Sequence, residues 1–265
     1  MNRTTWRRRL LSPGLIAPLI LGAVVIAVWQ SGAVHTLFNL KPYTVPYPDQ
    51  ILGAVSDDGD KLLKHVLVSV PAAVIGYGTG AILGFALGSA LVRFWSGSIS
   101  QILPVISASN ALPIVALAPL VGLFVGYGLP VKVIVVAFMT TPVMVVYTVR
   151  GLTSVNAETK ELMASIESTP GQVYRLVQIP TALPYIFTAL KSMVVLALIG
   201  VIVTEAMRGF EGLGFVIADA MSGFEAATAW LALVTIAFMG IVAYLIVGLV
   251  ERLVVPWDAA SRTSG

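Results

Sequence analysis

The chain contains no cysteine and only two histidines, His35 and His65, among its 265 residues. The lack of cysteine excludes disulfides, thiolate metal sites and cysteine nucleophiles. Because an imidazole metal site usually needs a third protein ligand, two histidines alone do not indicate a metal centre. The sequence also lacks a GxxxxGK[ST] phosphate-binding loop, and it shows no catalytic constellation. We therefore expect no metal, no cofactor and no ATP hydrolysis in this chain itself.

Charged side chains are scarce as well. They make up 11% of the chain, against about a quarter of an average soluble domain. Hydrophobic residues make up 57%, and the mean hydropathy is +0.92. A soluble protein with this composition would expose large apolar patches, whereas a bilayer accepts apolar side chains on the outside of a helical bundle. The composition therefore predicts an all-α integral membrane protein. The net charge of +3 is spread between apolar blocks and does not indicate a nucleic-acid surface.

Six apolar stretches are long enough to cross a hydrocarbon core, which takes about 20 residues of helix. They cover residues 15–34, 66–92, 103–125, 131–149, 183–204 and 230–249. We predict a six-helix membrane domain at 15–250, an N-terminal tail at 1–14 and a C-terminal tail at 251–265. The proline-rich, acidic segment 35–62 is predicted to be an external loop, and 151–182 a cytoplasmic loop. We expect the first stretch to be retained as a signal anchor.

Six spans place both termini on one side of the membrane, and the basic residues indicate which side. With cytoplasmic termini, about twice as many basic residues outside the spans or at their ends face the cytoplasm as face outwards. Arg150 and Arg175 belong to the larger group, and Lys41 and Lys132 to the smaller one. Because basic residues accumulate on the cytoplasmic side, this bias favours cytoplasmic termini.

Glycines and prolines are concentrated in the second, third and fourth stretches. The glycines of the second stretch leave one or more helix surfaces almost without side chains, which favours close helix packing. They are Gly76, Gly78, Gly80, Gly84 and Gly88. Prolines in the third and fourth stretches are expected to kink the helices and to free backbone carbonyls. They are Pro104, Pro113, Pro119 and Pro142.

The polar interval at 151–182 shows the pattern of two short helices. Residues 158–166 are good helix formers with apolar side chains at helical spacing, which predicts a short amphipathic helix. Ser168 or Thr169 can cap a second helix that begins at Pro170, where the missing N–H costs nothing. Two short helices joined by a turn make a compact knob that suits a groove on a partner protein. The pattern alone fits a hairpin lying on the lipid surface equally well.

The segment ELMASIESTPGQVYRLVQIPTALP, at residues 161–184, resembles the EAA loop of binding-protein-dependent ABC transporter permeases. Residues 161–163 stand at the Glu-Ala-Ala positions, residues 177–180 at the Ile-x-Leu-Pro ending, and Pro184 at the usual second proline. The chain departs from the family pattern at Glu167, where the pattern has a glycine. The turn between the two short helices must therefore tolerate a side chain.

Other segments are similar to the same family in the same order along the chain. They are VPYPDQILGAV, ALPIVALAPLVGLFVGYG, EGLGFVI and ERLVVPWD. Together they resemble the permeases for nitrate, taurine, aliphatic sulfonates, bicarbonate and pyrimidine precursors. The resemblance implies a six-transmembrane-helix type I ABC importer permease fold in the bacterial plasma (inner) membrane. It also implies a second permease copy, two ATPase subunits that bind ATP and Mg, and an extracytoplasmic solute-binding protein that largely sets the substrate.

The resemblance further implies that the loop at 151–182 docks on an ATPase subunit. The residues expected at that contact are Glu161, Leu162, Met163, Ile166, Glu167, Pro170 and Val173.

Five polar residues in or beside the spans are candidates for lining a transport pathway: Ser109, Asn110, Thr140, Thr141 and Glu205. Irregular backbone at membrane depth is tolerated where it faces protein or water, which suits the two residues beside the proline breaks. The same groups could instead repair freed hydrogen bonds, pack helices or form a paired helix end. A secondary transporter and a membrane-embedded enzyme stay open as alternative functions, although the sequence offers few ligands for a coupling ion.

Overall fold

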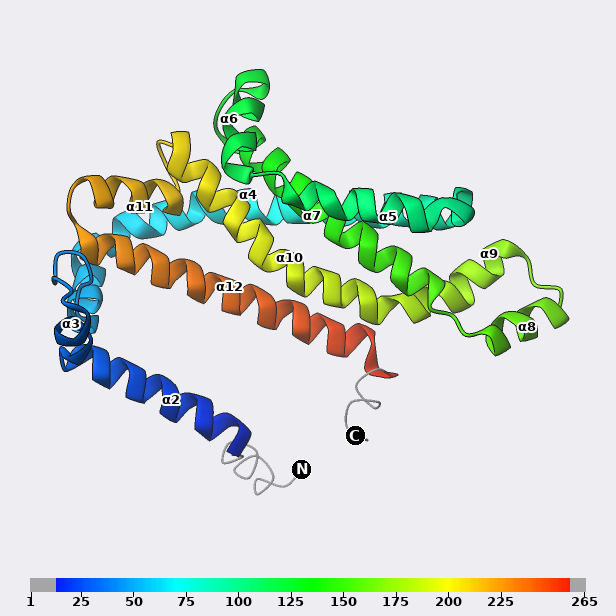
Figure 1. Ribbon diagram of the computed structural model, residues 1–265, viewed down its shortest axis with the longest axis horizontal. Coiled ribbons are helices and arrows are strands. Elements are labelled where there is room, and N and C mark those ends of the chain that lie inside the picture. The colour runs from blue at the N-terminus through cyan, green and yellow to red at the C-terminus, as the bar shows by residue number, and fades with distance from the viewer. Residues whose placement is uncertain (1–12, 258–265) are drawn as a thin grey trace.

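The computed structural model describes residues 13–257, which form helices joined by short turns and contain no strand. Figure 1 shows the long helices lying side by side, with a small helical hairpin projecting from one end. The elements are α2 (Pro13–Gln30), α3 (Ala33–Phe38), α4 (Pro48–Phe94), η1 (Ser96–Ser98), α5 (Ile99–Ala108), η2 (Ser109–Ala111), α6 (Ile114–Val125), α7 (Leu129–Thr153), α8 (Ala157–Ser165), α9 (Pro170–Val173), η3 (Tyr174–Gln178), α10 (Ile179–Arg208), α11 (Leu213–Ser222) and α12 (Ala226–Val254).

Four helical segments in the described part of the chain are long and apolar enough to cross a membrane. They are α4, α7, α12 and the run Pro170–Met207, which includes most of α10. These segments overlap the second, fourth, fifth and sixth predicted spans. The third predicted span is divided into α5, η2 and α6, as its prolines suggested. The first span corresponds to α2, while the tail residues 1–12 and 258–265 lie outside the described part.

Glycines allow α4 and α7 to pack closely, as the sequence predicted. Gly76, Gly80, Gly84 and Gly88 are buried and recur every fourth residue, so that they share one face of α4. A Cβ atom added at Gly84 would lie 2.5 Å from Met144 Cβ of α7. At the fifth glycine of the stretch, Gly78, an added Cβ would meet no atom within 4 Å, so this glycine is not part of the contact.

The predicted external loop 35–62 is wrong in its second half, because α4 already begins at Pro48. The helix starts there for a local reason: the Tyr47 backbone N–H donates to Gln50 Oε1 at 3.0 Å, and Pro48 occupies the first turn. The first turns of α4, which the sequence had assigned to the loop, are also held in place by tertiary packing. Ile51 and Leu62 are buried in a core cluster with residues of α11 and α12, including Leu213.

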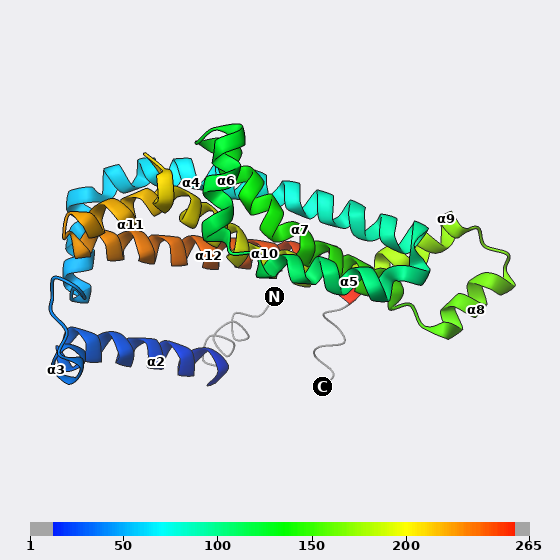
Figure 2. The ribbon, with the colours of Figure 1, turned by 45° about the horizontal axis from the view of Figure 1, so that its top comes forward.

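The boundary of the C-terminal tail also differs from the prediction at 251. Helix α12 continues to Val254, and Glu251 is buried, since it pairs with Lys191 of α10. At the other end of the chain, α2 lies at the edge of the bundle and is joined to α4 through α3 (Figures 1 and 2). Its apolar side chains at residues 20–28 are largely exposed, as suits a helix that faces lipid.

Candidate functional site

The two short helices predicted in the 151–182 loop are both present, as α8 and α9. We call residues 157–173 the α8–α9 hairpin; Figures 1 and 2 show it at one end of the molecule, clear of the main bundle. Helix α8 begins after Asn156, whose side chain accepts a hydrogen bond from the Thr159 N–H at 3.0 Å. Of the two predicted caps for the second helix, the structure selects Thr169. Its backbone N–H donates to Gln172 Oε1 at 2.7 Å, so the two residues form a capping box ahead of Pro170.

The turn between the two helices explains why a glycine is usual at position 167. Glu167 has φ 51°, a left-handed conformation that side-chain-bearing residues rarely adopt. The turn is closed by Ser168 N–H donating to the Met163 carbonyl at 3.0 Å and Glu167 N–H donating to the Ala164 carbonyl at 3.1 Å. This is the hydrogen-bonding pattern of a Schellman cap, whose left-handed residue is usually glycine. The chain therefore keeps the turn geometry and holds a glutamate in the strained position.

The apolar side chains of the hairpin divide into two groups. Leu162 and Ile166 are 61% and 64% exposed. Met163 and Val173 are half-buried and line a cavity between the hairpin and the end of α4. The remaining predicted contact residues, Glu161, Glu167 and Pro170, are exposed. The structure thus brings the seven predicted residues together on one hairpin but does not place Val173 on the exposed face with Ile166.

The hairpin continues into α10 without a break. Residues 174–178 form a single π-helical turn, in which the Ile179 N–H reaches the Tyr174 carbonyl. A π-turn is a local bulge inside a helix and is often found at functional sites. Pro180 lies in the first turn of α10, and Pro184 lies within the helix. The run from Pro170 to Met207 is therefore one helical segment of 38 residues.

A buried ionic cluster lies at the opposite end of α10. Glu205 is completely buried, and its carboxylate accepts hydrogen bonds from Lys132 Nζ at 2.8 Å and Ser69 Oγ at 2.9 Å. The Gly214 backbone N–H donates to its second oxygen at 3.0 Å. We call Ser69, Lys132 and Glu205 the Glu205 cluster; it joins α4, α7 and α10 to the start of α11. Its charges are paired inside the chain, which is how buried ions avoid the cost of desolvation.

The glycines of the EGLG sequence are required by this cluster. A Cβ atom at Gly212 would collide with the Glu205 carboxylate, and one at Gly214 would collide with the Ile202 carbonyl. Gly212 has φ 109°, which favours glycine as well. Its N–H donates to His65 Nδ1 at 2.9 Å, and the Leu213 N–H donates to Ser69 Oγ at 2.9 Å. The turn that leads into α11 is thus fixed directly over Glu205.

The pathway candidates lie in different environments. Thr140 is fully buried against Gly80 and donates to the Val136 carbonyl at 2.8 Å, so in this conformation it packs α7 on α4. Thr141 is partly buried and donates to the Ala137 carbonyl at 2.7 Å. Glu205 is likewise enclosed by its cluster rather than facing a passage. These positions correspond to the packing and paired-end alternatives that the sequence left open.

The proline break in the third span, unlike Thr140 and Glu205, lies at the surface of this chain. Ser109 is half-buried, and its hydroxyl donates to the Ile106 carbonyl at 2.7 Å, one of the hydrogen bonds that compensate for the break. Ser109 and Asn110 belong to the turn η2, and residues 111–113 are exposed at the surface of this chain. Helix α5 has 10 residues and α6 has 12. At about 1.5 Å per residue, the break lies near the middle of the span.

The sequence analysis also missed an ion pair between α10 and α12. Lys191, in the middle of α10, forms a salt bridge with Glu251 near the end of α12, and its ammonium group lies 5.9 Å from the ring centroid of Tyr244. The signal was available, because a lysine inside an apolar span normally needs a partner within the bundle.

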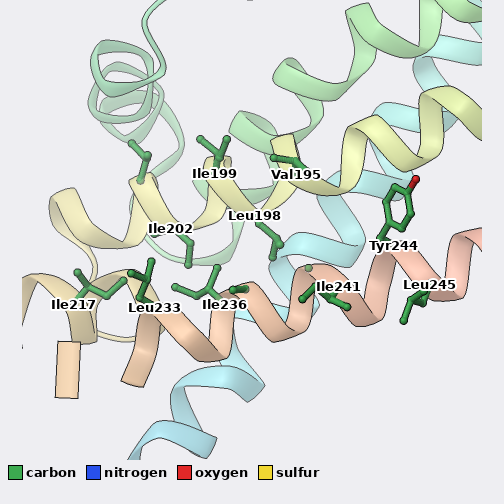
Figure 3. Close-up of a pocket in the computed structure, with 13 residues that line it drawn as sticks. Val195, Leu198, Ile199, Ile202, Ile217, Leu233, Ile236, Ile241, Tyr244 and Leu245 are labelled. Carbon is green, nitrogen blue, oxygen red and sulfur yellow. The ribbon is translucent and has the colours of Figure 1, made fainter. Parts of the chain in front are cut away.

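An apolar groove between α10 and α12 does not suit a polar solute. Figure 3 shows Leu198, Ile202, Ile236 and other aliphatic side chains facing into it. Tyr244 carries the one polar side-chain group of its lining. In a membrane-spanning chain such a groove can be filled by acyl chains or by another helix, and beyond the Tyr244 hydroxyl its side chains offer no hydrogen-bonding group for recognition.

Comparison with known proteins agrees with the fold. The family of binding-protein-dependent transport system inner membrane components matches residues 66–257. The riboflavin transport system permease protein of Chloroflexus aurantiacus is 33% identical over 252 residues, which cover 94% of this chain and 92% of that protein. The formylaminopyrimidine transport permease protein of Halalkalibacterium halodurans is 28% identical over 91% of this chain and 96% of its own length.

A solved structure shares the fold. In the inward facing MetNI methionine ABC transporter, one chain superposes with a TM-score of 0.61 and 19% identity, covering 73% of this chain and 95% of that chain. The resemblance seen in the sequence is therefore confirmed at the level of fold and family. The relatives are transport permeases rather than enzymes. This chain belongs to the family of binding-protein-dependent transport system inner membrane components, as a multi-pass permease subunit of an ABC importer for a small solute.

Proposed function

We propose that the α8–α9 hairpin docks in a cleft of a separate ATPase subunit and transmits the closure of that subunit to the membrane helices. The observation that carries the proposal is the pair of exposed apolar side chains, Leu162 and Ile166, on a hairpin that stands clear of the bundle (Figure 1). Exposed apolar side chains on a polar, capped hairpin suit a protein partner. ATP and Mg would be bound by that partner, because this sequence has no phosphate-binding loop.

The continuous helix from Pro170 to Met207 supports a rigid connection. A displacement of the hairpin moves the π-turn and α10 together, because no flexible linker separates them. The distance from Ile179 to Glu205 along α10 is about 39 Å at 1.5 Å per residue. A tilt of α10 therefore reaches the Glu205 cluster at its far end, which joins α10 to α4, α7 and α11. Rigid-body tilting of this kind is a common way to switch between two states.

We also propose that the permease pairs with a second copy of itself around the transport pathway, with the α5–α6 break facing that pathway. Residues 111–113 expose irregular backbone near the middle of a membrane span, and such backbone is not tolerated against lipid. It must face protein or water in the assembled transporter. Ser109 and Asn110 are the polar residues we assign to this region. A purified complex that contains a different permease polypeptide would contradict the self-pairing.

The orientation follows from the same arrangement. An ATPase acts in the cytoplasm, so the hairpin end of the bundle is the cytoplasmic end, and both termini are cytoplasmic. An extracytoplasmic solute-binding protein would then meet the end that carries the Glu205 cluster and α11. The positive-inside bias of the sequence agrees with this orientation.

For the solute we propose a vitamin or vitamin precursor rather than an inorganic anion. The supporting observation is that the relatives for riboflavin and formylaminopyrimidine share 33% and 28% identity with this chain, whereas a nitrate import permease protein of Synechocystis shares 26%. Titrating the partner binding protein with riboflavin, formylaminopyrimidine, taurine and nitrate measures its affinity for each and so tests the proposed class of solute. Selective binding of taurine or nitrate would contradict the proposal.

Crosslinking tests the docking of the hairpin directly. The chain has no cysteine, so an Ile166→Cys variant carries a single reactive thiol. We expect it to crosslink to the ATPase subunit in the assembled complex. Leu37→Cys is a matched control, because Leu37 is 78% exposed and belongs to α3, which lies at the opposite end of the molecule from the hairpin (Figure 1). Failure of Ile166→Cys to crosslink, in a complex that still contains the ATPase, would refute the docking role.

A further inference from the structure

A cavity of about 720 Å³ lies between the α8–α9 hairpin and the end of α4. Its walls are tied together by a hydrogen bond from the Tyr174 hydroxyl to Ser89 Oγ at 3.0 Å. Val92 and Phe94 of α4 and Val173 of α9 give the cavity apolar surface. The docking proposal rests on Leu162 and Ile166, and neither of these residues lines this cavity.

Two basic residues, Arg93 and Lys160, line the cavity from opposite walls, and no acidic residue lines it. Three ion pairs occur within residues 13–257, and neither Arg93 nor Lys160 takes part in any of them. The cavity therefore has two positive charges that no carboxylate of the described chain neutralises by a salt bridge. This arrangement favours a ligand with net negative charge.

The cavity lies at the level of the lipid head groups. The apolar run of α4 at residues 66–92 ends immediately before Arg93. Phe94 and Trp95 follow, and their side chains are 72% and 56% exposed. Aromatic and basic residues at the end of an apolar span mark the membrane–water interface. A ligand that combines an anionic head group with apolar chains would find both kinds of surface here.

We propose that this cavity binds the head group of an anionic glycerophospholipid from the adjoining leaflet. Arg93 and Lys160 contact the phosphate, and the glycerol region rests on Val92 and Phe94. A zwitterionic lipid has the same phosphate but no net charge, so it neutralises the two basic residues less well. Basic clusters next to a transmembrane helix recognise anionic lipids by this physical mechanism. The proposal stands apart from the docking function, because lipid retention is measured on the permease without the ATPase.

The test is native mass spectrometry of the full-length permease from micelles that contain equal amounts of phosphatidylglycerol and phosphatidylcholine. We expect the unmodified chain to retain phosphatidylglycerol preferentially. In the Arg93→Gln, Lys160→Gln double variant the preference should fall by about 30-fold. The conservative Arg93→Lys, Lys160→Arg variant should keep most of it. A double variant of two exposed lysines near the opposite end, Lys41→Gln with Lys64→Gln, is the matched control and should behave like the unmodified chain.

Three results would overturn the proposal. The unmodified chain could show no preference for phosphatidylglycerol, or the Arg93→Gln, Lys160→Gln variant could keep the preference unchanged. Complete displacement of the lipid by an equal concentration of soluble glycerol 3-phosphate would show that the site takes a free phosphate from water instead. A thermal unfolding curve for each variant establishes that the measured chain is folded.

Discussion

The Glu205 cluster and the α8–α9 hairpin, which lie at opposite ends of α10, differ in how their side chains are buried. At one end, Glu205 is fully buried, and its carboxylate is paired with Lys132 and Ser69 inside the chain. At the other end, Leu162 and Ile166 of the α8–α9 hairpin are exposed and have no counterpart in the described chain that buries them. At the first end, the charges and hydrogen bonds are satisfied inside the chain, so loss of one partner would leave the other buried and unpaired. The second leaves apolar surface uncovered, which is what a docking element needs.

The largest effect on stability should come from breaking the Glu205 cluster. Glu205→Ala leaves Lys132 buried without its counter-ion, and we expect it to lower the free energy of unfolding by about 3–5 kcal/mol. Denaturation of the purified chain in mixed detergent measures this change. The Lys132→Met, Glu205→Gln double variant should lose less than the sum of its two single variants. The two single variants of this cycle are Lys132→Met and Glu205→Gln. If their losses of unfolding free energy add up to the loss in the double variant, the ion pair does not couple α7 to α10.

The glycine turn above the cluster should show the next largest effect. At Gly214 an added methyl group would collide with the Ile202 carbonyl and lie 2.9 Å from Glu205 Cβ. We expect Gly214→Ala to cost about 1–3 kcal/mol of unfolding free energy. Gly223→Ala is the matched control, because the nearest atom to its added Cβ is the Asp219 carbonyl oxygen at 3.6 Å. Equal stability losses in the two variants would refute the steric explanation.

A smaller effect, of opposite sign, is expected at the turn of the hairpin. Glu167→Gly removes the cost of holding a side chain at φ 51°, which is about 1–2 kcal/mol. The amides of residues 163–169 should then exchange hydrogen more slowly. Glu161→Gly puts the same substitution inside α8, where glycine destabilises a helix, and should speed the exchange. Faster exchange in Glu167→Gly would mean that the glutamate side chain stabilises the turn.

The hairpin could be predicted from the sequence because its signals are local. Thr169 and Pro170 each act within one helical turn, so their roles can be predicted without knowledge of the tertiary structure. The glycine face of α4 was also recognisable, since its four-residue spacing is a property of one helix. In both cases the residues that matter lie close together in the sequence.

The remaining features depend on contacts between distant residues. The partners of Glu205 lie 136 and 73 positions away, at Ser69 and Lys132, so sequence spacing gave no sign of its burial. Lys191 and Glu251 are likewise 60 positions apart, so their spacing did not identify the pair, although a lysine inside an apolar span indicates that some partner exists. Prolines were informative only in part: the chain leaves the helix at Pro113, whereas Pro142 lies inside a continuous α7. Neighbouring helices can repair the hydrogen bonds that an intramembrane proline frees, and this repair is not visible in the sequence.

The smallest effect on stability, together with a large effect on transport, is expected for Ile166→Asp. Because Ile166 is 64% exposed, the charge should change the free energy of unfolding by no more than about 0.5 kcal/mol. Leu37→Asp is the matched control, because Leu37 is 78% exposed and belongs to α3, which lies at the opposite end of the molecule (Figure 1). Both variants should fold like the unmodified chain.

The most direct measurement is solute uptake and solute-stimulated ATP hydrolysis by the complete importer carrying Ile166→Asp, reconstituted in proteoliposomes. If the hairpin transmits the work of the ATPase, uptake and stimulation should both be lost, while the Leu37→Asp importer works normally. Normal uptake with normal stimulation in the Ile166→Asp importer would contradict the coupling role of the α8–α9 hairpin.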